Sequence, residues 1–270
     1  MANKIFLILC LVLLTFFPAT STLAQSPTQS EKKLEELPPH VPGEALIRFT
    51  RGITPPQAAN RMAEMGVVHK KTLPAIGVQL VALPQGLSVQ QAVDRFSQRP
   101  GIEFAEPNYI LSAQAPTEII VDEYDQWALD KIAAPSAWST FGADPFKPLL
   151  AIVDTGITPN HPDLSNNVWE NPGEIGLDDL GADKRSNGLD DDGNGYIDDW
   201  QGWDFVNNDN DPLDDQMHGT AVSGVAAAEN NGIGIAGVCP WCQLVGVKVL
   251  DSTGSGSLDI VADGILYAAQ

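Results

Sequence analysis

Two short motifs hold residue types that could carry out acid–base chemistry together. Asp154 closes the apolar run 149–153 and begins Asp-Thr-Gly-Ile, and His218 begins His-Gly-Thr at the head of a run of small residues. Such an apolar run is typical of a buried parallel strand, and a carboxylate at its end can orient an imidazole. The small residues favour a closely packed helix with His218 in its first turn. The two motifs therefore predict a general base, His218, that is held in place by Asp154.

Each motif also has another interpretation. Asp-Thr-Gly marks aspartic peptidases as well, but those need two carboxylates that share a proton, and no second Asp-Thr-Gly or Asp-Ser-Gly follows. A homodimer could supply the second carboxylate, although His218 would then have no part in the mechanism. His218 could also be a structural histidine with satisfied hydrogen bonds.

Three segments together resemble the subtilisin-like serine peptidases, the subtilase family. They are Asp154-Thr-Gly-Ile, His161-Pro-Asp-Leu and His218-Gly-Thr, and the match extends over about 122–270. The resemblance implies a serine-type endopeptidase whose substrate is an extended polypeptide. It also implies that Asp154 and His218 are two members of an Asp-His-Ser triad.

The third member of this triad is missing. In the family the serine lies in a Gly-Thr-Ser segment well downstream of the histidine, with the oxyanion-stabilising asparagine between them, and neither occurs before Gln270. We therefore expect a chain truncated before the catalytic serine, and the activity of the chain itself stays open. The alternative is a catalytically inactive fragment that acts as a protease-inhibiting or calcium-binding protein.

A candidate substrate-binding segment follows a predicted strand at 243–250. Gly254, Ser255 and Gly256 fall where the family places one edge of the substrate groove. Extended peptides bind such an edge through backbone hydrogen bonds, and glycines permit close backbone approach. The same residues could instead form an ordinary flexible loop.

Acidic residues concentrate between positions 178 and 215, where 13 carboxylates accompany only two basic side chains. So many like charges call for a counterion, which favours structural Ca²⁺. One loop has oxygen ligands at positions 1, 3, 5, 7 and 9 of a calcium loop, namely Asp190, Asp192, Asn194, the Tyr196 carbonyl and Asp198. Its twelfth position is a glutamine, so Asp199 or a distant carboxylate would have to complete the ligand shell.

Two further calcium sites are implied by the family resemblance. One is similar to a site of thermostable subtilases shortly before the catalytic histidine, with the ligands Asp204, Asn207, Asp209 and Asp211. The other is similar to the tight calcium site of the family, with the ligands Asp163, Asn231, Ile233 and Ile235, and with Asp122 or Glu123 as an N-terminal ligand. All three loops could instead be solvated acidic loops without an ion.

The N-terminus predicts export. Residues 1–24 are typical of a signal peptide, because Lys4 precedes the apolar stretch 5–17 and Ala24 ends a cleavage motif. That stretch is shorter than the roughly 20 residues of a membrane span, although a retained N-terminal anchor is the alternative. We expect a secreted or extracellular protein with no membrane contact after signal removal. Residues 25–40 are polar and contain three prolines, which indicates a flexible leader.

Residues 41–112 show a compact β-α-β-β-α-β pattern, which predicts a ferredoxin-like α+β domain. The expected strands lie at 43–49, 67–71, 77–83 and 102–109, and the expected helices at 55–65 and 88–97. The pattern resembles the subtilase propeptide, which implies an intramolecular chaperone and inhibitor, with the maturation junction at 113–121. A small domain without an inhibitory role is the alternative, because this order is a common superfold.

Residues 122–270 would then form the N-terminal part of an α/β peptidase domain with a parallel sheet, incomplete at its C-terminal side. A strand at 243–250 and an amphipathic helix at 257–269 support this class. This part has 26 acidic and 5 basic residues, a net charge of −21, which argues against a nucleic-acid partner.

Cys239 and Cys242 are the two cysteines outside the signal. In an oxidising compartment such a pair could close a tight disulfide. The alternatives are a redox site or a metal site. The strand-to-helix context of a redox motif is missing, and a structural zinc site needs four ligands.

Overall fold

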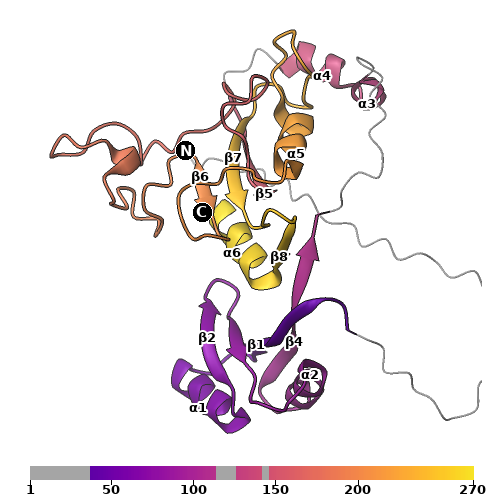
Figure 1. The fold of residues 1–270 in the computed structure, drawn as a ribbon, viewed down its shortest axis with the longest axis vertical. Coiled ribbons are helices and arrows are strands. Elements are labelled where there is room, and N and C mark those ends of the chain that lie inside the picture. The colour runs from indigo at the N-terminus through magenta and orange to yellow at the C-terminus, as the bar shows by residue number, and fades with distance from the viewer. Residues whose placement is uncertain (1–36, 114–125, 142–145) are drawn as a thin grey trace, which may run out of the picture. The chain divides into compact units, whose positions relative to one another are not determined.

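The computed structural model describes residues 37–113, 126–141 and 146–270. The predicted signal, most of the leader and most of the maturation junction lie outside the described residues. The chain forms two compact units, with the boundary between Ile110 and Leu111 (Figure 1). None of the helices in the described part of the chain combines the length and the apolar character that a bilayer crossing requires.

The first unit is an antiparallel sheet covered by two helices. Its strands are ordered β2-β3-β1-β4, and each of its neighbouring pairs runs antiparallel. Along the chain the elements are β1 His40–Phe49, α1 Pro55–Met65, β2 Val68–Leu73, β3 Val78–Ala82, α2 Val89–Ser97 and β4 Ile102–Ser112. The predicted ferredoxin-like order is therefore confirmed. The first strand begins at His40 and so includes the last residue of the predicted leader.

The helices of this unit begin and end at residues with clear local signals. The Ser88 hydroxyl accepts a hydrogen bond from Gln91 N at 3.2 Å, and Gln91 Oε1 accepts one from Ser88 N at 3.2 Å, which caps α2. The helix α1 begins at a proline and ends before Gly66, whose φ of 72° suits glycine.

One core holds the first unit together. Met62 of α1 and Phe96 of α2 both pack with Ala45 and Ile47 of β1. Because residues two apart in a strand point to the same face, both helices cover one face of the sheet. Phe96 is fully buried, which makes it an anchor of this core.

The second unit is built on a parallel sheet with the strand order β5-β7-β6. Its strands are β5 Leu149–Asp154, β6 Gly202–Asp204 and β7 Gln243–Lys248. Both pairings are parallel, with Leu149 opposite Gln243 and Gly202 opposite Gly246. The other elements are α3 Trp127–Lys131, α4 Ala134–Phe141, the 3₁₀ turn η1 Lys184–Ser186, α5 His218–Ala227, the short strand β8 Ser255–Ser257 and α6 Leu258–Ala268.

Helices cover both faces of this parallel sheet. Leu150 and Ile152 pack with Ala227 at the end of α5, whereas Ala151, between them in β5, packs with Tyr267 of α6. Alternate residues of β5 therefore face different helices. This arrangement confirms the predicted α/β class with a parallel sheet.

The strand predicted at 243–250 is shorter in the structure. It ends at Lys248, because the next two amides, Val249 N and Leu250 N, both donate to the backbone oxygen of Asp154 at 2.8 and 3.1 Å. The ends of β5 and β7 are thus joined at Asp154.

Candidate active site and cation sites

Asp154 and His218 form a hydrogen-bonded pair at the carboxyl edge of the parallel sheet. Asp154 is the last residue of β5, and His218 is the first residue of α5. The distance between His218 Nδ1 and Asp154 Oδ1 is 2.7 Å, and the same oxygen accepts a hydrogen bond from Thr155 N at 2.7 Å. The Asp154 side chain is 6% exposed and that of His218 is 25% exposed. The buried carboxylate therefore holds one ring nitrogen while part of the imidazole stays accessible.

Close backbone contact brings these two residues together. A Cβ atom at Gly219 would lie 2.2 Å from the carbonyl oxygen of Gly156, so the start of α5 touches the turn after β5. Gly219 N also donates to Thr155 Oγ1 at 2.9 Å. Met217 precedes the helix with a φ of 84°, in the left-handed region that non-glycine residues rarely adopt.

The predicted substrate-binding residues lie in the short strand β8 and directly before it. Ser255 and Gly256 lie in β8, and Gly254 precedes it with a φ of 75°. The carbonyl of Gly254 accepts a hydrogen bond from Ala113 N at 2.7 Å, and the hydroxyls of Ser112 and Ser255 lie 3.2 Å apart. The second unit begins at Leu111, so the last two residues of β4 belong to it. Ser112 and Ala113 are therefore in the same unit as β8. In this structure an extended segment of the chain therefore lies against the edge.

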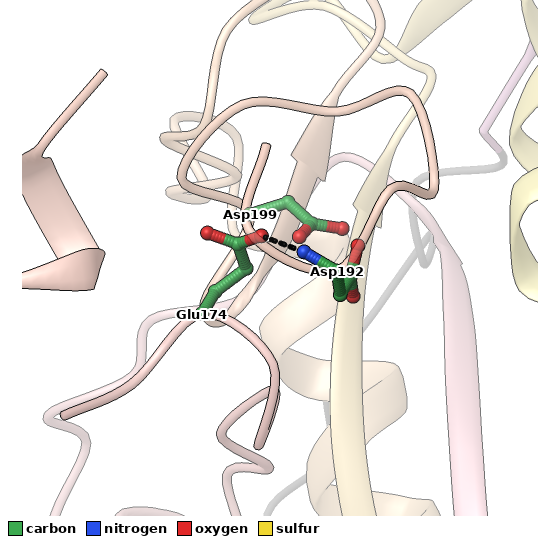
Figure 2. Close-up of side chains that lie close together, drawn as sticks. All are labelled: Glu174, Asp192 and Asp199. Atoms are coloured by element: carbon green, nitrogen blue, oxygen red, sulfur yellow. Dashed lines mark hydrogen bonds between the residues drawn. The ribbon is translucent and has the colours of Figure 1, made fainter. Parts of the chain in front are cut away.

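A group of three carboxylates, two of them buried, lies in the long acidic loop. Glu174, Asp192 and Asp199 each have a carboxylate oxygen within 4.8 Å of the others, close enough to hold one metal ion (Figure 2). Glu174 Oε1 accepts hydrogen bonds from Asp191 N at 2.7 Å and Asp192 N at 3.1 Å. Glu174 and Asp199 are fully buried, and Glu174 Oε2 has no hydrogen-bond partner.

Amide and phenol groups surround Asp199. Asn171 Nδ2 donates to Asp199 Oδ1 and to Asp192 Oδ2, each at 2.9 Å. Asn194 Nδ2 and Tyr267 Oη donate to Asp199 Oδ2 at 2.9 and 2.7 Å. Through Tyr267 the acidic loop is tied to α6, on the main body of the second unit.

The other predicted ligands of this loop have different roles in the structure. Asp190 accepts hydrogen bonds from the backbone of Gly193, Asn194 and Gly195, and Asp198 accepts them from Gly188 N. The Tyr196 ring packs edge-on against other aromatic rings, namely those of Trp203, Phe205 and Tyr267. Within the described residues, the carboxylate group suited to a metal thus contains Asp192 but neither Asp190 nor Asp198.

Burial shifts the pKa of three carboxyl groups in the second unit. It raises the pKa of Glu174, Asp199 and Asp204 above their ordinary values, because desolvation disfavours the charged form. Hydrogen bonds to each group oppose the effect without cancelling it. A bound cation would offset the same desolvation, so these residues fit an oxygen-ligated metal.

The second predicted site is a tight turn around a buried aspartate. Asp204 Oδ1 accepts hydrogen bonds from Val206 N and Asn207 N at 2.7 and 3.0 Å, and Asn207 Nδ2 donates to Asp204 Oδ2 at 2.9 Å. Asp209 Oδ1 accepts a hydrogen bond from Asp211 N at 3.1 Å. The chain reverses direction in this turn, because Asp204 and Asp209 pair through an isolated antiparallel β-bridge. The side chains of Asp204 and Asn207 therefore contact each other, and the Asp209 carboxylate accepts from the backbone of Asp211.

The third predicted site has a buried carboxylate oxygen without a partner. Asp163 Oδ2 accepts a hydrogen bond from Ile235 N at 2.9 Å, and Asp163 Oδ1 is buried and unpartnered. Asn231 Oδ1 accepts from Ile233 N at 3.0 Å, which shapes the loop beside Asp163. Asp122 and Glu123, the predicted N-terminal ligands, lie outside the described residues.

Gln126 reaches the Asp163 loop from the N-terminal side. Its side-chain amide donates to Ala236 O at 2.8 Å and accepts from Ala236 N at 2.9 Å. Neither Gln126 nor Glu174 is among the site residues expected from the sequence, although Glu174 is a distant carboxylate near Asp192 of the kind expected there. Nothing around Glu174 in the sequence signals its burial. Gln126 lies within the segment 122–270 that resembles the peptidase domain.

Cys239 and Cys242 are joined by a disulfide with Cα atoms 5.4 Å apart. Cys242 is buried beside Leu244 in the core that α5 covers. The loop 239–242 closes immediately before β7, so the bond fixes the entry of the chain into the central strand.

Two protein families match the chain. The subtilase family matches residues 147–270, and the fervidolysin N-terminal prodomain matches residues 26–108. One match falls within each of the two units. The second unit carries an Asp–His pair at the carboxyl edge of a parallel sheet and is therefore of the subtilisin-like peptidase class. The first unit is of the class of the prodomain of such a peptidase.

Individual relatives agree with these matches. The thermophilic serine proteinase of Bacillus sp. (strain AK1) is 31% identical over 234 residues, which cover 86% of this chain and 50% of that protein. Thermitase of Thermoactinomyces vulgaris is 39% identical over 146 residues, which cover 54% of this chain and 40% of that protein. The chain thus spans half or less of the length of these relatives.

The fold is also found in a solved structure. The crystal structure of fervidolysin from Fervidobacterium pennivorans, a keratinolytic enzyme related to subtilisin, matches with a TM-score of 0.55 at 21% identity. The match covers 85% of this chain and 34% of that chain. The solved structure thus shows the same fold, and the family matches show that residues 147–270 are a subtilase domain and that residues 26–108 are a fervidolysin-type prodomain.

Proposed function

We propose that this chain supplies the prodomain, the catalytic aspartate and the catalytic histidine of a subtilisin-like serine endopeptidase. The observation that carries the proposal is the 2.7 Å hydrogen bond between Asp154 and His218 at the carboxyl edge of the parallel sheet. In a protein whose fold family cleaves peptides with an Asp-His-Ser triad, this pair has the geometry of the first two members.

The two residues would have distinct roles. Asp154, buried and already hydrogen-bonded to Thr155 N, would accept a hydrogen bond from Nδ1–H of His218 and fix the tautomer of the ring. Nε2 of His218 would then be free to take a proton from a serine hydroxyl. Ser223 does not fit that role, because its buried hydroxyl donates to Gly219 O at 2.7 Å within α5. Among the described residues, no serine is hydrogen-bonded to His218.

The substrate would be an extended polypeptide bound at Gly254, Ser255 and Gly256. The support is the backbone edge that these residues form and the hydrogen bond that Gly254 O accepts from Ala113 N. A peptide that adds to such an edge is held by its backbone, which makes the edge tolerant of side chains.

The first unit would be an intramolecular chaperone and inhibitor of the peptidase, as the match of residues 26–108 to a prodomain supports. Export through a signal at residues 1–24 and maturation within 113–121 complete this proposal. The alternative of an inactive, inhibitory fragment has no specific observation in its favour.

Structural Ca²⁺ would hold the loops of the second unit in place. Asp192 and Asn194, with Asp199 and Glu174, would hold one ion, and Asp163 with the loop 231–235 would hold another. The support is the pair of buried oxygens without partners, Glu174 Oε2 and Asp163 Oδ1. In the second predicted site, Asp204 and Asn207 contact each other through their side chains, which supports a joint contribution of these two residues.

Determining the reading frame downstream of the Gln270 codon, and expressing the whole frame, tests the proposed activity. We expect the whole protein to cleave an unfolded protein substrate, and Asp154→Asn and His218→Ala to lower kcat by a factor of about 10⁴ or more. A whole protein that cleaves equally well without either side chain would disprove the proposed roles.

A further inference from the structure

Asp214 lies four positions before His218 and collects five hydrogen bonds. Its Oδ1 accepts from Thr155 Oγ1, Gln216 N and Met217 N at 2.8, 3.0 and 2.8 Å. Its Oδ2 accepts from Thr220 N and Thr220 Oγ1 at 2.8 and 2.6 Å. The side chain thus binds the backbone on both sides of His218.

Thr155 links this carboxylate to the residue that holds His218. Its hydroxyl donates to Asp214 Oδ1 and accepts from Gly219 N, and its backbone N donates to Asp154 Oδ1. Thr155 is fully buried, so these contacts exclude water. One buried residue therefore contacts Asp154, Asp214 and the helix that begins at His218.

The turn before α5 needs such a constraint. Met217 has a φ of 84°, and this conformation persists only where surrounding contacts determine it. Met217 N donates to Asp214, and the side chain of Met217 is 78% exposed, so packing of this side chain does not hold the turn. The carboxylate also faces the first amides of α5, where negative charge is favourable.

We propose that Asp214 is a positioning residue that acts through Thr155 and the turn at Met217 to hold the His218 imidazole against Asp154. The inference deepens the proposed function, on which it rests for the meaning of the Asp154–His218 pair. A displacement of about 1 Å at such a pair can cost two orders of magnitude in rate. Asp214 itself does not contact the reacting groups.

The test uses the full chain and a readout at the imidazole, because this readout does not require the serine. We would record the His218 Nδ1 proton and the ring ¹⁵N resonances by NMR in five variants. They are Asp214→Asn, Thr155→Val, Thr155→Ser, Asp179→Asn and Asp154→Asn. Asp179 is an exposed carboxylate in the same acidic unit, so Asp179→Asn is the matched control for charge removal.

The expected pattern separates positioning from folding. Asp214→Asn and Thr155→Val should broaden or shift the His218 Nδ1 proton resonance, while Thr155→Ser, which keeps the hydroxyl, and Asp179→Asn should leave it in place. A lowered unfolding temperature with an unchanged resonance in both Asp214→Asn and Thr155→Val would overturn the inference, since a purely structural cap would give that result. If Asp214→Asn fails to fold, the Thr155 pair decides by itself.

The outcome also separates this inference from the proposed function. If Asp154→Asn leaves the His218 resonances unchanged, the proposed function fails. If Asp154→Asn moves them but Asp214→Asn and Thr155→Val do not, the inference alone fails.

Discussion

Gly219 and Gly156 touch at a point where no side chain can fit, since a Cβ atom at Gly219 would lie 2.2 Å from Gly156 O. This contact seats the first turn of α5 on the turn that follows β5. Asp154 lies two residues before Gly156, and His218 directly precedes Gly219. The close approach of the two backbones therefore sets the distance between the Asp154 and His218 side chains.

Replacement of Gly219 with alanine should therefore move the start of α5. We expect Gly219→Ala to destabilise the second unit by about 1–3 kcal/mol, as overpacking of a tight contact does. The measurement is the free energy of unfolding by urea. We also expect the His218 Nδ1 resonance to shift in this variant.

Gly224 provides the matched control, because it lies in the same helix. A Cβ atom there would lie 3.5 Å from Ile235 Cδ1, which is an ordinary contact. Gly224→Ala should leave the stability unchanged or raise it by up to about 1 kcal/mol, since alanine is the better helix former. Equal losses in the two variants would contradict the close-contact account.

Calcium should stabilise the second unit through Asp199. At a calcium concentration about 100 times Kd, a single site should raise the free energy of unfolding by about 2.7 kcal/mol. Asp199→Asn removes one carboxylate of the group around Glu174, so most of this gain should be lost. The measurement is the thermal midpoint of the full chain with Ca²⁺ and with a chelator.

Asp179→Asn is the control for the calcium experiment, because Asp179 is exposed in the same acidic loop. This variant should keep the full calcium-dependent shift. Loss of the shift in both variants would point to diffuse charge neutralisation instead of a site.

The raised pKa values of Glu174, Asp199 and Asp204 predict an unusual pH dependence. Their folded-state values lie above the ordinary 4.5 of Glu and 3.8 of Asp, so the folded form binds protons more tightly in that range. Stability therefore falls as the pH rises through the folded pKa values. Without calcium, the thermal midpoint should therefore rise as the pH is lowered through the folded pKa values of these three groups.

Bound calcium should remove this rise, because protons compete with the ion for the same oxygens. Asp214 changes the stability of the folded form with pH in the opposite direction, because its hydrogen bonds lower its pKa in spite of burial, and this effect acts only at lower pH. That contribution is present above the ordinary value of 3.8 and is lost as the pH falls through the folded pKa. A calcium-free midpoint that falls steadily from neutrality would show that the buried carboxyl groups do not control the titration.

The order of the elements and the pair of Asp154 and His218 could be predicted from local sequence. The apolar run 149–153 and the small residues after His218 are each continuous in the sequence. The first predicts a buried strand and the second predicts a closely packed helix. Their pairing was predicted from the residue types of the two motifs together with the family resemblance, although the two residues lie 64 positions apart.

The carboxylate group around Glu174 could not be predicted in the same way. Spacing at alternate positions predicts Asp190 and Asp198 as ligands, and in the structure both carboxylates accept backbone hydrogen bonds from their own loop, so their part in a cation site stays a prediction. Glu174 is brought to Asp192 by packing of distant segments, which no local period encodes. Asp214 did leave a signal, because a carboxylate shortly before a helix start is typical of a cap.

The state of the His218 ring in the full chain tests the central claim most directly. Imidazole ¹⁵N chemical shifts, recorded in the neutral form, report which nitrogen carries the proton. The account predicts a proton on Nδ1, facing Asp154 Oδ1, and an unprotonated Nε2, with Asp154→Asn shifting the proton toward Nε2 because the amide can donate to Nδ1. A neutral ring protonated on Nε2, or spectra that do not change in Asp154→Asn, would contradict it.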